Sequence, residues 1–149
     1  MVKHGFIAGV MFSIALVAST DNVKVSWEDL SGYNYETGTM SPLLQEVNQK
    51  RVEVEGFIVP TDLEGDIDTV HAFFLVPNPL ACIHVPPPPP NQMIYVTMNK
   101  PIPIDMDERG VRITGLLSVG QPEDQSFYVG FELDGDSAVS AEIEWEDPF

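Results

Sequence analysis

Cys82 and His84 are the residues whose types and spacing could support metal or nucleophile chemistry. They are the single cysteine and one of three histidines in a chain of 149 residues, and one residue separates them. In an extended chain, residues i and i+2 point to the same side, so a thiolate and an imidazole at this spacing can converge on one ion. Such sulfur and nitrogen ligands suit zinc or copper. The spacing therefore predicts a metal site at Cys82 and His84.

A metal at this position needs further ligands from elsewhere in the chain. His71, Met93 and Met98 are candidates beside the many carboxylates, and no spacing selects among them. A free cysteine is also among the most buried residue types, so a structural role for Cys82 and His84 stays open. As a nucleophile with His84 as its base, Cys82 lacks an identifiable oxyanion element or orienting acid. The pattern therefore favours a protein that is not an enzyme.

Five consecutive prolines follow the pair, and two side-chain amides end the run. Proline has no N–H donor and a fixed φ, so the run joins neither a helix nor a central strand and forms a polyproline II rod about 15 Å long. Aromatic grooves recognise such rods, which makes this segment a candidate docking site for a protein partner. The predicted partner-binding residues are Pro86, Pro87, Pro88, Pro89, Pro90, Asn91 and Gln92.

A structural role for the same segment is the alternative. The run could lie along the domain as a brace, tied down by the apolar residues Val85 and Met93 that flank it. In that arrangement the side-chain amides of Asn91 and Gln92 would satisfy some of the proline carbonyls, which have no donors of their own nearby.

The N-terminus has the pattern of a secretory signal peptide. Lys3 supplies a positive charge, Phe6–Val17 is an apolar stretch, and Val17–Ser19 is a small-residue cleavage site. As a helix this stretch would span about 18 Å, against about 30 Å of membrane hydrocarbon, so we expect cleavage rather than anchoring. The sequence thus predicts a periplasmic protein with a signal peptide at residues 1–19, a single β-rich domain at residues 20–149, and no membrane span after cleavage.

Charge restricts the classes of partner. The chain has 23 acidic and 7 basic residues and a formal net charge of −16 at pH 7. Such a surface repels phosphate backbones, which excludes nucleic acid as a partner and favours cations or basic proteins.

The hydrophobic pattern predicts a mainly β fold. Residues 20–40 form an extended lead-in that packs Trp27, Tyr33 and Tyr35, and Ser41-Pro42 with Leu43, Leu44 and Val47 on one face starts a short helix. Strands are predicted at Lys50–Val59, Ala72–Val76, Met93–Met98, Gly110–Val119, Ser126–Leu133 and Val139–Trp145, with a turn at Asp134–Asp136 between the last two. Five or six short strands with one helix indicate a small barrel like the oligonucleotide/oligosaccharide-binding (OB) fold, with an irregular proline-rich crossing between two strands.

Several segments resemble an exported bacterial family, domain of unknown function 3299. They are Trp27–Leu30, Arg51–Pro60, Phe74–Pro77, Val111–Gly115 and above all the Cys-x-His, proline-rich, Asn-Gln segment Ala81–Gln92. The resemblance covers nearly all of the mature chain. It implies a periplasmic β-barrel-like domain associated with transporter components and metal homeostasis, and it implies no established enzymatic activity.

Two functions follow from the residues and the resemblance together. The first is a periplasmic, non-catalytic accessory protein that binds zinc or copper through Cys82 and His84, with His71 or Met93 as further ligands. The alternative is an interaction module whose proline-rich segment docks a transporter component or another envelope protein, with Cys82 and His84 purely structural.

Overall fold

The computed structural model describes residues 22–61, 68–82, 87–103, 110–120 and 128–144, with only the backbone of Ala81 and Cys82. The predicted signal peptide at residues 1–19 lies outside these residues. Within the described part of the chain, no helix is both long enough and apolar enough to cross a membrane.

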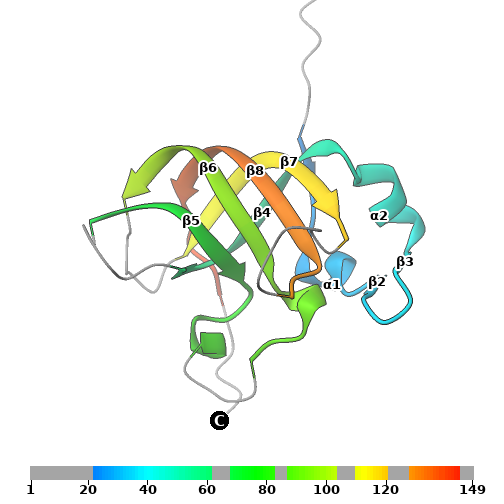
Figure 1. The fold of residues 1–149 in the computed structure, drawn as a ribbon. Coiled ribbons are helices and arrows are strands. Elements are labelled where there is room, and N and C mark those ends of the chain that lie inside the picture. Colours follow the sequence, from blue (N-terminus) through cyan, green and yellow to red (C-terminus); the bar gives the residue numbers. More distant parts are fainter. Residues whose placement is uncertain (1–21, 62–67, 83–86, 104–109, 121–127, 145–149) are drawn as a thin grey trace, which may run out of the picture.

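Five long strands close into a β-barrel (Figure 1). They are β4 (Lys50–Pro60), β5 (Thr69–Val76), β6 (Ile94–Pro103), β7 (Val111–Val119) and β8 (Phe131–Ser140). Their order is β4-β5-β6-β8-β7, and β7 pairs back onto β4. The β6–β8 pair is parallel, whereas the other barrel pairs are antiparallel. A closed, five-stranded barrel in this order is the architecture of the OB fold, so the predicted fold class is confirmed.

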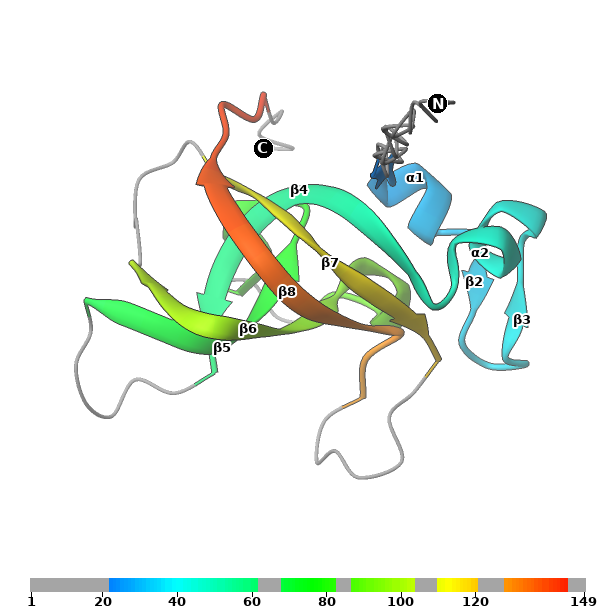
Figure 2. The same cartoon turned by 90° about the horizontal axis from the view of Figure 1, so that it is seen from above.

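The smaller elements precede the barrel in the chain. They are β1 (Val23–Lys24), α1 (Trp27–Leu30), β2 (Tyr33–Asn34), β3 (Thr39–Met40) and α2 (Pro42–Val47). Strand β1 pairs in parallel with the first half of β4, while α1, α2 and the β2–β3 hairpin gather on one side of the barrel (Figure 2). Two short 3₁₀ turns, η1 (Pro79–Cys82) and η2 (Pro90–Gln92), lie in the crossing from β5 to β6.

The core follows from strand alternation. In β4, Val52 and Val54 are fully buried while the alternating residues Glu53 and Glu55 point outward, because successive side chains of a strand face opposite sides. Helix α2 closes one side through Leu44 and Val47, whereas Leu43, predicted on the same face, is exposed. Burying one such side chain contributes about 1.5–3 kcal/mol. Among the described residues no polar or charged side chain is buried.

The predicted turn at Asp134–Asp136 is wrong, because these residues lie inside β8. A register shift between Thr114 and Gly115 on β7 accommodates an extra residue of β8 at this point, so the strand continues through a β-bulge. Gly135 faces the interior, where a Cβ would collide with the sulfur of Met98. Glycine here leaves room for a core side chain and does not form a hairpin turn, so the two predicted strands are one.

Helix α1 was not predicted, although its start has a local signature. Ser26 and Asp29 form a capping box: the Asp29 amide donates to Ser26 Oγ (3.1 Å), and the Ser26 amide donates to Asp29 Oδ2 (2.9 Å). The hydrogen bonds from Ser26 hold the pKa of the Asp29 carboxyl below its usual value. This box starts the helix at Trp27, whose indole N–H donates to the Glu55 carbonyl (2.7 Å) and ties the helix to β4.

Arg112 on β7 lies at the centre of a charge cluster on the outside of the barrel. It is directly opposite Glu55 on β4, and its Nη2 is 2.7 Å from Glu55 Oε1 while its Nε is 3.2 Å from Glu53 Oε1. Lys24 Nζ of β1 is 3.2 Å from Glu55 Oε1. Hydrogen bonding to Arg112 is the main cause that lowers the pKa of Glu55; burial opposes it, and Lys24 adds to the lowering.

Acid is therefore expected to weaken the barrel through Glu55. Because the folded-state pKa of Glu55 lies below its unfolded value, the stabilisation is complete above the unfolded pKa and is lost as pH falls through the folded one. Urea unfolding of the wild type and of Glu55→Gln, at about pH 6 and about pH 3, measures the effect. The free energy of unfolding should fall more steeply with acid in the wild type. Glu46→Gln, on the exposed face of α2, is the control for loss of one carboxylate, and its free energy of unfolding should fall with acid as much as that of the wild type. An equal fall in Glu55→Gln and the wild type would contradict the expectation.

Candidate docking site at the proline-rich crossing

The crossing starts and ends at neighbouring strands. Leu75 of β5 pairs with Ile94 of β6, so the chain leaves the barrel after Val76 and returns to the adjacent strand. Its described parts, η1, Pro87–Pro89 and η2, lie away from the barrel wall (Figure 1). A long irregular segment on a rigid scaffold is where binding residues are commonly found.

Side-chain amides at the end of the run bind it to the lead-in. Asn91 Nδ2 donates to the Tyr33 carbonyl (3.2 Å), and Gln92 Nε2 donates to Ser31 Oγ (3.0 Å) and the Trp27 carbonyl (3.4 Å). For the described prolines Pro87–Pro90, the expectation that these amides satisfy proline carbonyls is wrong, since the amides reach α1, Ser31 and β2 instead. The proline carbonyls find backbone donors: the Gln92 amide donates to Pro89 (2.8 Å).

A second anchor comes from the start of β8. The Gly130 amide donates to the Pro90 carbonyl (2.8 Å), and a Cβ on residue 130 would lie 2.7 Å from that oxygen. Beside this contact the ring of Tyr33 packs on Phe131 with centroids 5.6 Å apart. Burial raises the pKa of the Tyr33 phenol, and the neighbouring Tyr128 raises it further. The end of the proline run is thus fixed by both the lead-in and the barrel.

The described prolines alternate in exposure. Pro87 and Pro89 are exposed, whereas Pro88 and Pro90 are half-buried. Pro89 has φ −65° and ψ 157°, which is the polyproline II conformation. The run therefore combines features of both alternatives: its last residues are braced against the fold, and one of its faces is available to solvent.

The structure describes only part of the predicted metal site. Cys82 ends the 3₁₀ turn η1, so its backbone is not extended as the spacing argument assumed. The Leu80 amide donates to the Asn78 side chain (2.8 Å), a local bond that favours a turn over an extended chain. The side chain of Cys82, and His84 and Pro86 entirely, lie outside the described residues.

The further ligand candidates do not lie together. Met93 lies beside Val76 at one end of the β5–β6 pair, while His71 is exposed about 16 Å away along β5, at five residues of strand. Met98 is 1% exposed in the core. In the described part of the chain, no three His, Cys, Asp or Glu side chains cluster as metal ligands would.

Three contributors to the anchor were missed by sequence reasoning. Ser31 and Tyr33 lie about 60 positions before their partners in the chain, and Gly130 lies 40 positions after Pro90. Only the capping box before α1 offered a local signal, and it marks a helix start rather than a contact. Pairing at this separation comes from the fold and has no short-range pattern.

The fold and the anchored crossing define a small OB-like barrel module. The chain belongs to the DUF3299 family, proteins of unknown function, whose family model matches residues 15–140. A crystal structure of a DUF3299 family protein from Pseudomonas aeruginosa is similar, with 21% identity, a TM-score of 0.62, and coverage of 85% of this chain and 99% of that one.

A putative aspartyl-tRNA synthetase from Leishmania major gives a TM-score of 0.42 and 14% identity over 91% of this chain and 24% of that one. No curated protein sequence gives a significant match.

Proposed function

We propose that the protein is a non-catalytic docking module of the bacterial periplasm that presents its proline-rich crossing to a transporter component or another envelope protein. One observation carries the proposal: the hydrogen bonds of Asn91, Gln92 and Pro90 fix the end of the proline run while Pro87 and Pro89 face solvent. A segment held in its binding conformation loses little conformational entropy when it binds.

The chemistry of the partner follows from the rod and the charge. Exposed prolines in polyproline II form dock into grooves lined by aromatic side chains. The net charge of −16 favours a groove with a basic rim, because complementary charge accelerates encounter and excludes acidic competitors. The expected partner is therefore an envelope protein with an aromatic groove flanked by lysine or arginine.

Capture from a periplasmic extract tests this proposal. The bait is the wild type, a Pro87→Ala/Pro89→Ala variant, or Pro42→Ala as a matched control, since Pro42 is an exposed proline at the start of α2. Proteins identified by mass spectrometry should include one that the wild type and Pro42→Ala retain and the double variant loses. Undiminished capture of every protein by the double variant would rule the proposal out.

Metal handling is the second candidate, and the Cys82-x-His84 pair carries it. In this proposal the thiolate and imidazole bind zinc or copper(I), and the acidic surface raises the local cation concentration. Titration of the metal-free protein with zinc and with copper(I) tests it. The wild type should bind one equivalent, and Cys82→Ser and His84→Ala should each lose it; absence of stoichiometric binding above the variants would end this candidate.

A further inference from the structure

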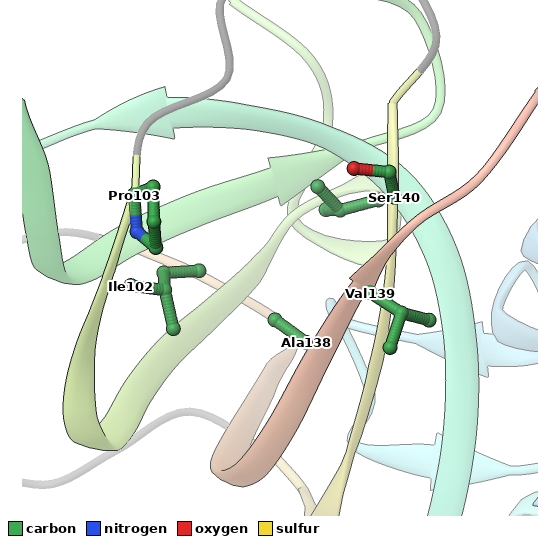
Figure 3. Close-up of a pocket in the computed structure, with 6 residues that line it drawn as sticks. Ile102, Pro103, Ala138, Val139 and Ser140 are labelled. Atoms are coloured by element: carbon green, nitrogen blue, oxygen red, sulfur yellow. The ribbon is translucent and has the colours of Figure 1, made fainter.

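Strands β6 and β8 separate at one end of the barrel, and an apolar crevice opens between them (Figure 3). They pair from Ile94 and Phe131 as far as Met98 and Gly135. Beyond that point β6 pairs only with β5, and β8 pairs only with β7. The crevice has a volume of about 270 Å³ and is lined by Ile102, Pro103, Val111, Ala138, Val139 and Ser140.

Two residues of β8 beside this crevice have backbone groups that no described strand pairs with. The Ala141 amide donates to the Gly110 carbonyl (3.1 Å), which makes that pair a bonded one. Opposed residues in an antiparallel ladder alternate between hydrogen-bonded and non-hydrogen-bonded pairs. The backbone N–H and C=O of Val139 therefore point toward β7, whereas those of Ala138 and Ser140 point away from β7. No described strand pairs with this edge.

The opposite lip of the crevice is protected from pairing. Pro101 and Pro103 of β6 have no N–H, and proline is tolerated in a strand where its nitrogen faces away from a neighbour. In contrast, the β8 lip has two residues with both donor and acceptor. An added strand can therefore pair with β8 but finds no donors at these two positions of β6.

We propose that this edge of β8 binds an extended peptide segment of another protein, which adds a strand and inserts one apolar side chain into the crevice. Strand addition satisfies these backbone groups of Ala138 and Ser140, and alternate side chains of the added strand fall on the crevice. At about 270 Å³ the crevice is smaller than the roughly 300–1,000 Å³ of small-molecule pockets, which suits a single side chain.

Charge selects the peptide and disfavours a second copy of this chain. Exposed acids flank the edge on both sides: Asp134 and Asp136 precede it, the latter bridged to Arg51, and Glu142 and Glu144 follow it. A second β8 laid antiparallel on the first would bring these acids against each other, which is unfavourable. The bound segment is therefore basic at its ends and apolar at its centre.

Peptide selection on the full chain tests the proposal. The probe is a displayed library of nine-residue peptides, and the variants are Ser140→Pro and Ser140→Ala. Proline at 140 removes an N–H that β7 does not use, whereas alanine keeps it. Selected peptides should have a central apolar residue and lysine or arginine near both ends, and their affinity should fall about five-fold or more in Ser140→Pro and stay within about two-fold in Ser140→Ala.

A second variant separates loss of binding from loss of folding. Ala138→Leu fills the crevice without changing the backbone and should weaken the same peptides; thermal unfolding reports whether each variant folds. The Pro87→Ala/Pro89→Ala variant should bind the peptides normally, so this result is independent of docking through the prolines. The proposal fails if no peptide is enriched, if selected peptides bind Ser140→Pro as tightly as wild type, or if the full chain self-associates through this edge.

Discussion

Gly115→Ala is expected to destabilise the barrel by about 3 kcal/mol or more, because overpacking against backbone cannot be relieved by a side-chain movement. A Cβ on residue 115 would overlap the Asp134 carbonyl oxygen and would lie 2.8 Å from the Asp134 carbonyl carbon and 2.9 Å from Gly135 Cα. These atoms belong to the paired strand β8 at its bulge. Making room would break the β7–β8 pairing that closes the barrel.

Urea unfolding followed by far-ultraviolet circular dichroism measures this effect. Gly38→Asn is the matched control, since Gly38 has φ +71° and open space around its Cβ position, and asparagine tolerates that conformation. It should lower the free energy of unfolding by less than about 1 kcal/mol. If Gly115→Ala unfolds at the same urea concentration as the wild type, the close approach of the two strands at the bulge does not exist.

The barrel was predictable because its strands have periodic local signals. Alternation along Lys50–Val59 and Gly110–Val119 identifies both strands and their inward faces, and the structure places both close to those bounds. The turn predicted at Asp134–Asp136 is wrong because the dipeptide Asp-Gly, which favours a hairpin turn, also fits a β-bulge. In this bulge the absence of a side chain on Gly135 makes room for Met98. Only the neighbouring strands distinguish the two.

The candidate site was predictable in position but not in geometry. Five prolines mark an irregular segment, because proline cannot join a sheet interior. What holds the segment is non-local: the amides of Asn91 and Gln92 reach a lead-in about 60 residues away, and their targets are mostly backbone carbonyls, which every residue has. The unpaired edge of β8 also results from non-local contacts. Its availability depends on where β6 departs, which no stretch of sequence specifies by itself.

Gly130→Ala is expected to release the proline run from the barrel. A Cβ at this position would lie 2.7 Å from the Pro90 carbonyl oxygen and 3.1 Å from Tyr33 Cδ1, so η2 must move away from β8. That movement also stretches the hydrogen bond from the Gly130 amide to the Pro90 carbonyl. We expect the free energy of unfolding to fall by about 2 kcal/mol, from overpacking and the weakened hydrogen bond together.

Amide hydrogen exchange distinguishes release of the run from general loss of stability. In Gly130→Ala the amides of residue 130 and Gln92 should exchange faster at denaturant concentrations where those of β4 keep their protection, because a local opening leaves the barrel intact. Ser31→Ala is the milder control: it removes one acceptor of the Gln92 side chain (3.0 Å) and should lower the free energy of unfolding by about 0.5–1 kcal/mol. If docking depends on a fixed run, partner capture should decrease in the order wild type, Ser31→Ala, Gly130→Ala. Equal capture by all three would mean that the anchor stabilises the fold without preparing the prolines for binding.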